Sequence, residues 1–120
     1  MMNYLKVGNT DLSHLVNSLK VGYETLVSED SGRNANGDSV IDVINEKTKI
    51  YVGLRYTTQE EMDMFLDAIN VFVNNVSFLD PRTNALRTIT AYRGTPEPEY
   101  YTIQDGMIMY KPMSINFVEL

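Results

Sequence analysis

The sequence predicts a mainly β fold with one α-helix, in which antiparallel strands form a sandwich or a partly open barrel and an amphipathic helix flanks them. Several segments alternate apolar and polar residues with a period of two, as half-buried strands do. Only one segment repeats its apolar residues at helical spacing. Short connections rich in turn residues separate consecutive strand segments, and such connections join antiparallel neighbours.

The first part of the chain predicts a short strand and then a hairpin with a long tip. Residues 3–7 form the short strand, and residues 19–27 alternate cleanly enough to form the first long one. Residues 28–38 hold glycines and asparagines and no large apolar side chain, so they form a loop. Residues 39–44 resume an apolar stretch, which predicts the return strand of the hairpin.

A further strand and the single helix follow. Residues 49–56 alternate most clearly of all, and the helix is predicted over residues 58–73. Thr57 and Thr58 are each followed three residues later by a glutamate, so either can begin the helix with a capping box. Residues 74–75, two asparagines, suit the end of the helix. Its apolar stripe consists of Met62, Phe65, Leu66, Ile69, Phe72 and Val73.

The last third predicts strands joined by short turns. Residues 80–84 carry turn residues around a proline, and residues 93–99 form a loop because two prolines exclude regular pairing. Residues 105–106, Asp-Gly, predict a tight hairpin between the strands on either side. With no linker and no internal repeat, residues 1–120 form a single domain. The predicted strands cover residues 76–79, 86–92, 100–104, 107–110 and 113–120.

Composition excludes several classes of function. The 120 residues contain no cysteine and one histidine, His14, which excludes disulfides, thiolate chemistry and cysteine-ligated metals. The 16 acidic and 10 basic residues give a net charge of −6, which opposes binding to nucleic acid or to an anionic membrane. No apolar run is long enough to span a membrane, and the N-terminus lacks the pattern of a signal peptide.

Three groups of residues could carry chemistry, and each has a simpler structural interpretation. His14 lies near Asp11 and Ser13, but no sequence feature places a nucleophile on a sharp turn. The carboxylates of the predicted helix could bind a hard cation or act as an acid–base pair, but they are expected to form its solvated face. Glu97 and Glu99 could flank a sugar, yet they alternate with prolines in a stiff loop. The helix acids are Glu60, Glu61, Asp63 and Asp67.

The loop over residues 28–38 fits neither calcium nor phosphate binding. An EF-hand register with Gly37 at its sixth position puts Gly32 at the first and Val43 at the twelfth. No Lys-Ser or Lys-Thr pair follows a glycine, as a phosphate-binding loop requires. The loop is therefore either a floppy tip or an arm that orders against a partner, and long loops favour the arm. Its expected contact residues are Glu29, Asp30, Arg33, Asn34, Asn36 and Gly37, with Arg33 as the anchor.

The order of these elements resembles that of small tail proteins of tailed phages and prophages of Gram-positive bacteria. The resemblance is carried by the polar loop of residues 31–37, the threonine-capped helix, the turn at residues 80–83 and the closing residues 116–119. It implies the tail-tube fold, which tail tube proteins share with the ring-forming domain of distal tail proteins.

The resemblance also implies a function. It implies a structural, non-enzymatic virion component, either a distal-tail or baseplate adaptor ring or a tube subunit, assembled in the host cytoplasm. Subunits would join edge to edge into a homo-oligomeric ring, with six as one candidate number, and contact other tail proteins. DNA would pass through the acidic lumen without specific binding, and no cofactor or metal is expected. The alternatives are a head–tail completion protein, a standalone protein-binding module or a small hydrolase.

Overall fold

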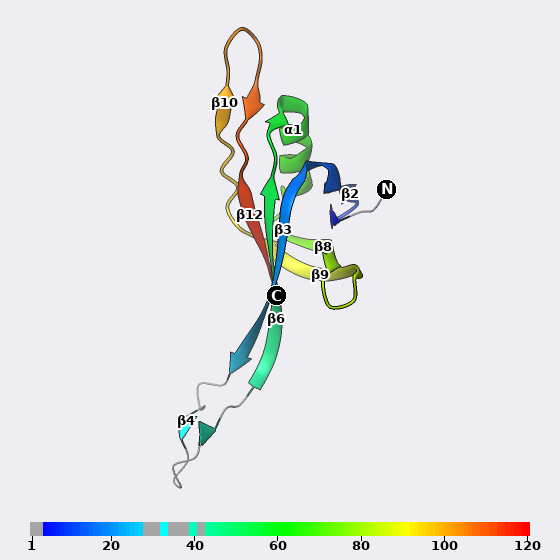
Figure 1. Ribbon diagram of the computed structural model, residues 1–120, viewed down its shortest axis with the longest axis vertical. Helices are drawn as coiled ribbons and strands as arrows, with labels where there is room; N and C mark the ends of the chain where they lie inside the picture. Colours follow the sequence, from blue (N-terminus) through cyan, green and yellow to red (C-terminus); the bar gives the residue numbers. More distant parts are fainter. Residues whose placement is uncertain (1–3, 28–31, 34–38, 41–42) are drawn as a thin grey trace.

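A seven-stranded antiparallel sheet forms the frame of the molecule, as the computed structural model shows for residues 4–27, 32–33, 39–40 and 43–120 (Figure 1). Its strand order is β2-β1-β8-β9-β12-β6-β3. The first and last strands of this order do not pair with each other, so the sheet does not close into a barrel. The strands are β1 (Leu5–Val7), β2 (Thr10–Asp11), β3 (Val16–Val27), β6 (Val43–Leu54), β8 (Val73–Asp80), β9 (Ala85–Arg93) and β12 (Ser114–Glu119).

Two small sheets and one helix complete the described part of the chain. A three-stranded sheet has the order β10-β11-β7, and β4 pairs with β5 beyond the long hairpin of β3 and β6. The helix α1 (Gln59–Ala68) contacts β7 and β11, and a single turn of 3₁₀ helix, η1 (Ser13–Leu15), precedes β3. The remaining strands are β4 (Gly32–Arg33), β5 (Ser39–Val40), β7 (Thr57–Thr58), β10 (Tyr100–Thr102) and β11 (Met109–Tyr110).

One hydrophobic core joins the large sheet to the helix. Met62, Phe65 and Ile69 of the helical segment are buried together with alternate residues of the central strands. Phe117 of β12 has no exposed surface and Ile115 is 4% exposed, so these alternate residues of the last strand face the core. The predicted fold class is therefore confirmed: the described chain is mainly β, antiparallel and open, with a single flanking helix.

Local turn and cap chemistry acts as the sequence predicts. Of the two candidate capping boxes, the structure uses the one at Thr58. The Glu61 N–H donates to Thr58 Oγ1 at 3.3 Å, and the Thr58 N–H donates to Glu61 Oε1 at 3.0 Å. Asp105 and Gly106 have φ angles of 57° and 74°, as both central residues of a type I′ turn do, and the Met107 N–H donates to the Gln104 carbonyl at 3.0 Å. The strands on either side are shorter than predicted, because β10 ends at Thr102 and β11 begins at Met109.

The predicted helix over residues 58–73 is too long at its C-terminal end. It ends at Ala68, and the predicted stop at residues 74–75 is wrong because both asparagines lie in β8. Arg93 of β9 explains the early end. Its Nε donates to the Ile69 carbonyl at 2.6 Å, and its backbone N–H donates to the Phe72 carbonyl at 3.0 Å. A cation is favourable at a helix C-terminus. Because Arg93 belongs to β9, its contacts hold the residues after the helix beside the sheet.

Strand boundaries differ in the first half of the chain as well. Residues 39–40 lie in β5, whereas residues 43–44 belong to the same strand as residues 49–54, because β6 is continuous from Val43 to Leu54. The short first strand is found as β1. Ser13 holds the start of β1 in place, because its Oγ accepts hydrogen bonds from the backbone N–H groups of Tyr4 and Leu5 at 2.7 and 3.1 Å.

The helix cap yields a test of local stability. Thr58→Ala removes the side-chain acceptor for the Glu61 N–H, so we expect the free energy of unfolding to fall by about 1 kcal/mol. Thr58→Ser keeps the hydroxyl and should stay close to the parent chain. Urea unfolding followed by circular dichroism measures both, and equal losses in the two variants would contradict the capping role.

Candidate functional site

The hairpin of β3 and β6 leaves the body of the molecule and points away from the helix (Figure 1). The two strands pair over their whole length, from Val16 opposite Leu54 to Val27 opposite Val43. The third strand, β12, pairs with β6 only from Gly53 to Lys49. Beyond Lys49 the described hairpin has two strands, and a two-stranded ribbon is marginally stable on its own. We call this part, residues 23–27 with 43–48, the arm.

The arm is fixed to the body by a buried carboxylate. Asp80, at the end of β8, is 2% exposed, and its Oδ1 accepts hydrogen bonds from the Tyr23 hydroxyl and from the Arg82 N–H, the latter at 3.1 Å. Arg87 Nη1 lies 3.5 Å from Asp80 Oδ2. The hydrogen bond from Tyr23, followed by those from Arg82 and the charge of Arg87, lowers the pKa of Asp80. Burial and the same carboxylate raise the pKa of Tyr23.

Two arginines extend this contact to the other strand of the arm. The Arg82 guanidinium lies 3.8 Å from the centre of the Tyr23 ring, and its Nη1 lies 2.8 Å from Glu46 Oε1. Arg87 Nη1 donates to Thr48 Oγ1 at 3.2 Å. Both strands of the arm are thereby held against the turn between β8 and β9.

The C-terminal strand closes the cluster. Glu119 Oε1 accepts a hydrogen bond from the Thr48 N–H at 2.9 Å, and its Oε2 lies 3.8 Å from Arg87 Nη2. Four chain segments thus meet where the arm leaves the body. We call this group the root cluster, and it consists of Tyr23, Glu46, Thr48, Asp80, Arg82, Arg87 and Glu119.

Most of the contact residues predicted for the arm lie outside the described residues. Glu29, Asp30, Asn34, Asn36 and Gly37 belong to that group. Arg33 lies in β4, where it is opposite Ser39 of β5. The structure therefore shows the arm as far as Val27 and Val43 and the short β4–β5 ladder, and the contact role of these six residues stays a prediction.

The candidate groups for acid–base and nucleophilic chemistry are not brought together. His14 is exposed in η1, whereas the Ser13 hydroxyl is buried against β1. Asp11 accepts the Ser13 N–H at 3.0 Å, and its hydrogen bonds with Ser13 lower its pKa. The described residues hold no cluster of three metal-ligating side chains and no helix long and apolar enough to cross a membrane.

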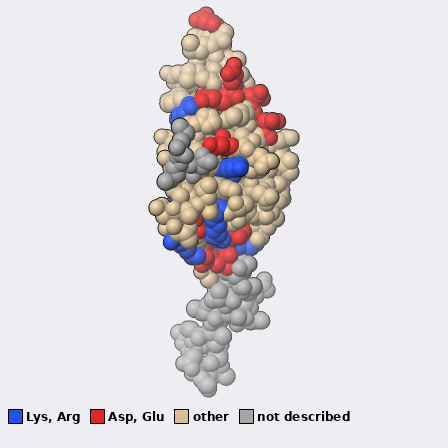
Figure 2. Space-filling view, turned by 90° about the vertical axis from the view of Figure 1, so that its right-hand side faces the viewer, with Lys and Arg blue, Asp and Glu red and all other residues tan. Residues whose placement is uncertain are grey.

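The acidic helix is partly neutralised by an arginine that precedes it. Arg55 makes a two-pronged contact with Glu61, at 2.6 and 3.2 Å. This contact and the hydrogen bonds with Thr58 lower the pKa of Glu61 to about 2. Glu60, Asp63 and Asp67 are exposed, as predicted for a solvated face. In Figure 2 acidic side chains gather towards the end opposite the arm, whereas both signs mix beside the arm.

The carboxylates of the proline-rich loop do not form a pair that could flank a sugar. Glu97 and Glu99 are both exposed. Glu99 Oε1 lies 3.6 Å from Lys111 Nζ, and the Glu99 carbonyl accepts the Lys111 N–H at 2.9 Å. The loop is thereby tied to the residue directly after β11, which is a structural role.

A family model matches residues 2–120, which is nearly the whole chain. The chain belongs to DUF6711, a family of unknown function. No curated protein matches this DUF6711 chain in sequence.

Two solved structures share the fold of this DUF6711 member. One is a chain in the tail of an empty GTA particle with C6 symmetry, with a TM-score of 0.56 and 8% identity, covering 88% of this chain and 78% of that chain. The other is a chain in the virion of a native gene transfer agent (GTA) particle, with a TM-score of 0.56 and 7% identity. This match covers 98% of this chain and 89% of that chain. The fold of this chain is thus found among chains of GTA tail and virion particles, whereas the tail-tube fold and the Gram-positive host stay predictions.

The root cluster predicts a loss of stability when one hydrogen bond is removed. Tyr23→Phe takes away the hydroxyl that Asp80 accepts, so we expect the free energy of unfolding to fall by about 1.5–3 kcal/mol. Tyr51→Phe is the matched control, because the Tyr51 hydroxyl has no hydrogen-bond partner within the described ranges. Chemical unfolding of both variants is the measurement. Equal, small losses would show that the Tyr23 contact does not stabilise the fold.

The Arg55–Glu61 pair predicts a pH dependence. The pKa of Glu61 is lower in the folded chain than its ordinary 4.5, so its contribution is complete above about pH 5 and is lost as pH falls towards 2. We expect Glu61→Gln to unfold more easily at pH 7 and to lose less stability than the parent between pH 5 and 2. Glu60→Gln, at an exposed position, should keep the parent profile. Parallel profiles for the parent and Glu61→Gln would contradict the linkage.

Proposed function

We propose that this chain is a structural component of a phage-like tail, in which copies assemble into a ring around a channel. The likeness to a chain of a C6-symmetric tail carries the proposal, because it extends over 88% of this chain and the similar chain belongs to a tail assembly. A ring built from one chain uses two different surfaces of each copy, repeated from neighbour to neighbour. The finer assignments are an adaptor ring at the distal tail or baseplate, or the tube itself, in a phage or prophage of Gram-positive bacteria.

The shape and charge of the chain support this role. The arm reaches out from a rigidly held root, as a segment that contacts a neighbouring subunit must. The net charge of −6 suits a channel through which DNA moves without binding. The arrangement of the described carboxylates, histidine and hydroxyls offers no acid–base or nucleophilic site, which favours a structural role over the hydrolase alternative.

Electron microscopy of the concentrated protein tests the proposal. We expect rings or stacked tubes with a central hole; isolated rings would support the adaptor and long tubes the tube subunit. Deleting residues 34–37 should abolish assembly, while circular dichroism shows that the subunit is still folded. Normal assemblies from the deletion variant would exclude the arm as a contact. Uniform small particles from the parent would contradict self-assembly and favour a head–tail completion protein or a binding module.

A further inference from the structure

The strand β3 lies at the edge of the large sheet and has a long outer side that pairs with no strand of the described chain. It is 12 residues long, whereas the other strands that end the described sheets have two or three residues. Its pairing with β6 is irregular only at its two ends, between Val16 and Ser18 and between Leu26 and Val27. A long, regular edge presents a row of unpaired backbone N–H and C=O groups, and such an edge is a template for a further strand.

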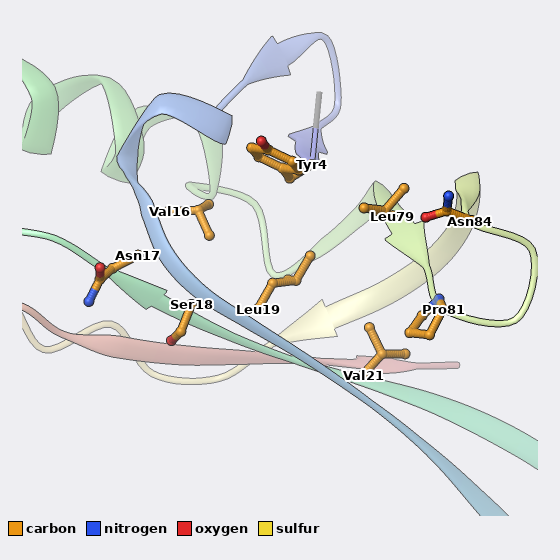
Figure 3. A pocket seen from close by; sticks show the side chains of 9 residues that line it. All are labelled: Tyr4, Val16, Asn17, Ser18, Leu19, Val21, Leu79, Pro81 and Asn84. Atoms are coloured by element: carbon orange, nitrogen blue, oxygen red, sulfur yellow. The ribbon is translucent and has the colours of Figure 1, made fainter. Parts of the chain in front are cut away.

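A groove of about 400 Å³ lies beside this edge (Figure 3). Leu19 and Val21 of β3 face Leu79 and Pro81 from the end of β8 and its turn, and Tyr4 lies at the upper side. The groove is where the curled sheet fails to close, because β3 and β8 approach each other here without pairing. A strand added to β3 would direct every second side chain into this apolar space.

The described chain carries a short strand with the complementary features at its other end. Tyr101 of β10 is 59% exposed, and Ile103, directly after β10, is 63% exposed. The pairing of β10 with β11 shifts register between Tyr100 and Thr102, which interrupts the alternation of side chains at Tyr101. The Tyr101 ring packs edge-on against Tyr56, with 5.2 Å between ring centres, so Ile103 is the exposed apolar side chain that this segment offers to a partner. Tyr100 stacks on Tyr110, with 4.9 Å between ring centres. The outer edge of β10 has no paired strand in the described sheet.

We propose that β10 of a second copy pairs with the free edge of β3, so that its Ile103 fills the groove beside Leu19 and Val21. This inference rests on the proposed self-assembly and identifies the two surfaces that meet. The contact is heterologous: each copy offers β3 to one neighbour and β10 to the other, so it repeats around a ring. The partner contributes backbone hydrogen bonds along the edge and one apolar anchor, Ile103, which is recognition by strand addition.

Charge favours a second copy as the occupant. Lys20 is exposed on β3 and has no acidic partner in the described chain, where its ammonium lies over the Tyr51 ring at 5.3 Å. The β10 segment is flanked by acids, with Glu97 before it and Asp105 after it, and neither makes an ion pair within the described ranges. The edge strand thus offers a base where the incoming segment carries acids, and such complementarity fixes partner and register.

Disulfide trapping tests the contact directly, because the chain contains no cysteine of its own. Single-cysteine variants are made at position 20 or 21 of β3 and at position 102 or 103 of β10, and one of each kind is mixed under oxidation. Opposite residues of an antiparallel pair have the Cα separation that a disulfide needs. We expect at least one mixture to yield mostly mixed-variant dimers on non-reducing gels, while each variant alone does not.

Matched controls separate strand addition from random collision. Thr88→Cys of β9 is also exposed, and it should not trap with the β10 variants. Ile103→Lys should abolish assembly, whereas Leu120→Lys, at a residue that is 58% exposed, should not. Equal trapping with Thr88→Cys, or normal assembly of Ile103→Lys, would overturn the inference.

The outcomes distinguish this contact from the proposed function. Rings or tubes that form without any trapped pair between β3 and β10 would leave the tail function standing and exclude this interface. A parent chain that stays monomeric at high concentration and traps no pair would exclude both. Trapped pairs in a population of rings would support the two proposals together.

Discussion

The direction of the projecting hairpin depends on one buried carboxylate. Taking the charge of Asp80 out of water costs several kcal/mol unless hydrogen bonds and opposite charges compensate it. The compensation comes from Tyr23 on one side and from Arg82 and Arg87 on the other. The same groups that satisfy the carboxylate therefore connect β3 to the turn between β8 and β9. A two-stranded ribbon that would bend freely is held at a set angle to the body.

The second constraint is that the large sheet stays open, so its core must be covered by other elements. The helix α1 covers the inner face through Met62 and Phe65, and η1 seals the end beside β1, where Leu12 and Leu15 are buried. The hydrophobic core is thus complete even though β3 has no partner on its outer side.

The sequence predicts the elements whose causes are local and misses those whose causes are distant. The capping box at Thr58 and the turn at Asp105 and Gly106 involve residues close in sequence, so a short sequence pattern is enough to predict them. The helix end is set by Arg93, 24 residues away from the carbonyl that it binds. The root cluster is more distant still, because Tyr23 and Asp80 are 57 positions apart. No periodicity records such a contact, and an Asp-Pro turn alone indicates solvent exposure rather than a buried charge.

The strand β3 belongs to both proposed contacts, and the root cluster lies between them. Its first half, with Leu19 and Val21, borders the groove, and its second half enters the arm beyond Tyr23. The strand that borders the groove therefore continues into the arm, ahead of the predicted contact residues, and the angle between the two proposed contacts is set where Tyr23 meets Asp80. In a closed ring every copy must keep the same angle, because small errors add up around the ring. The rigid fixation of the arm at its root thus meets a geometric requirement of assembly, which the stability of a single copy does not impose.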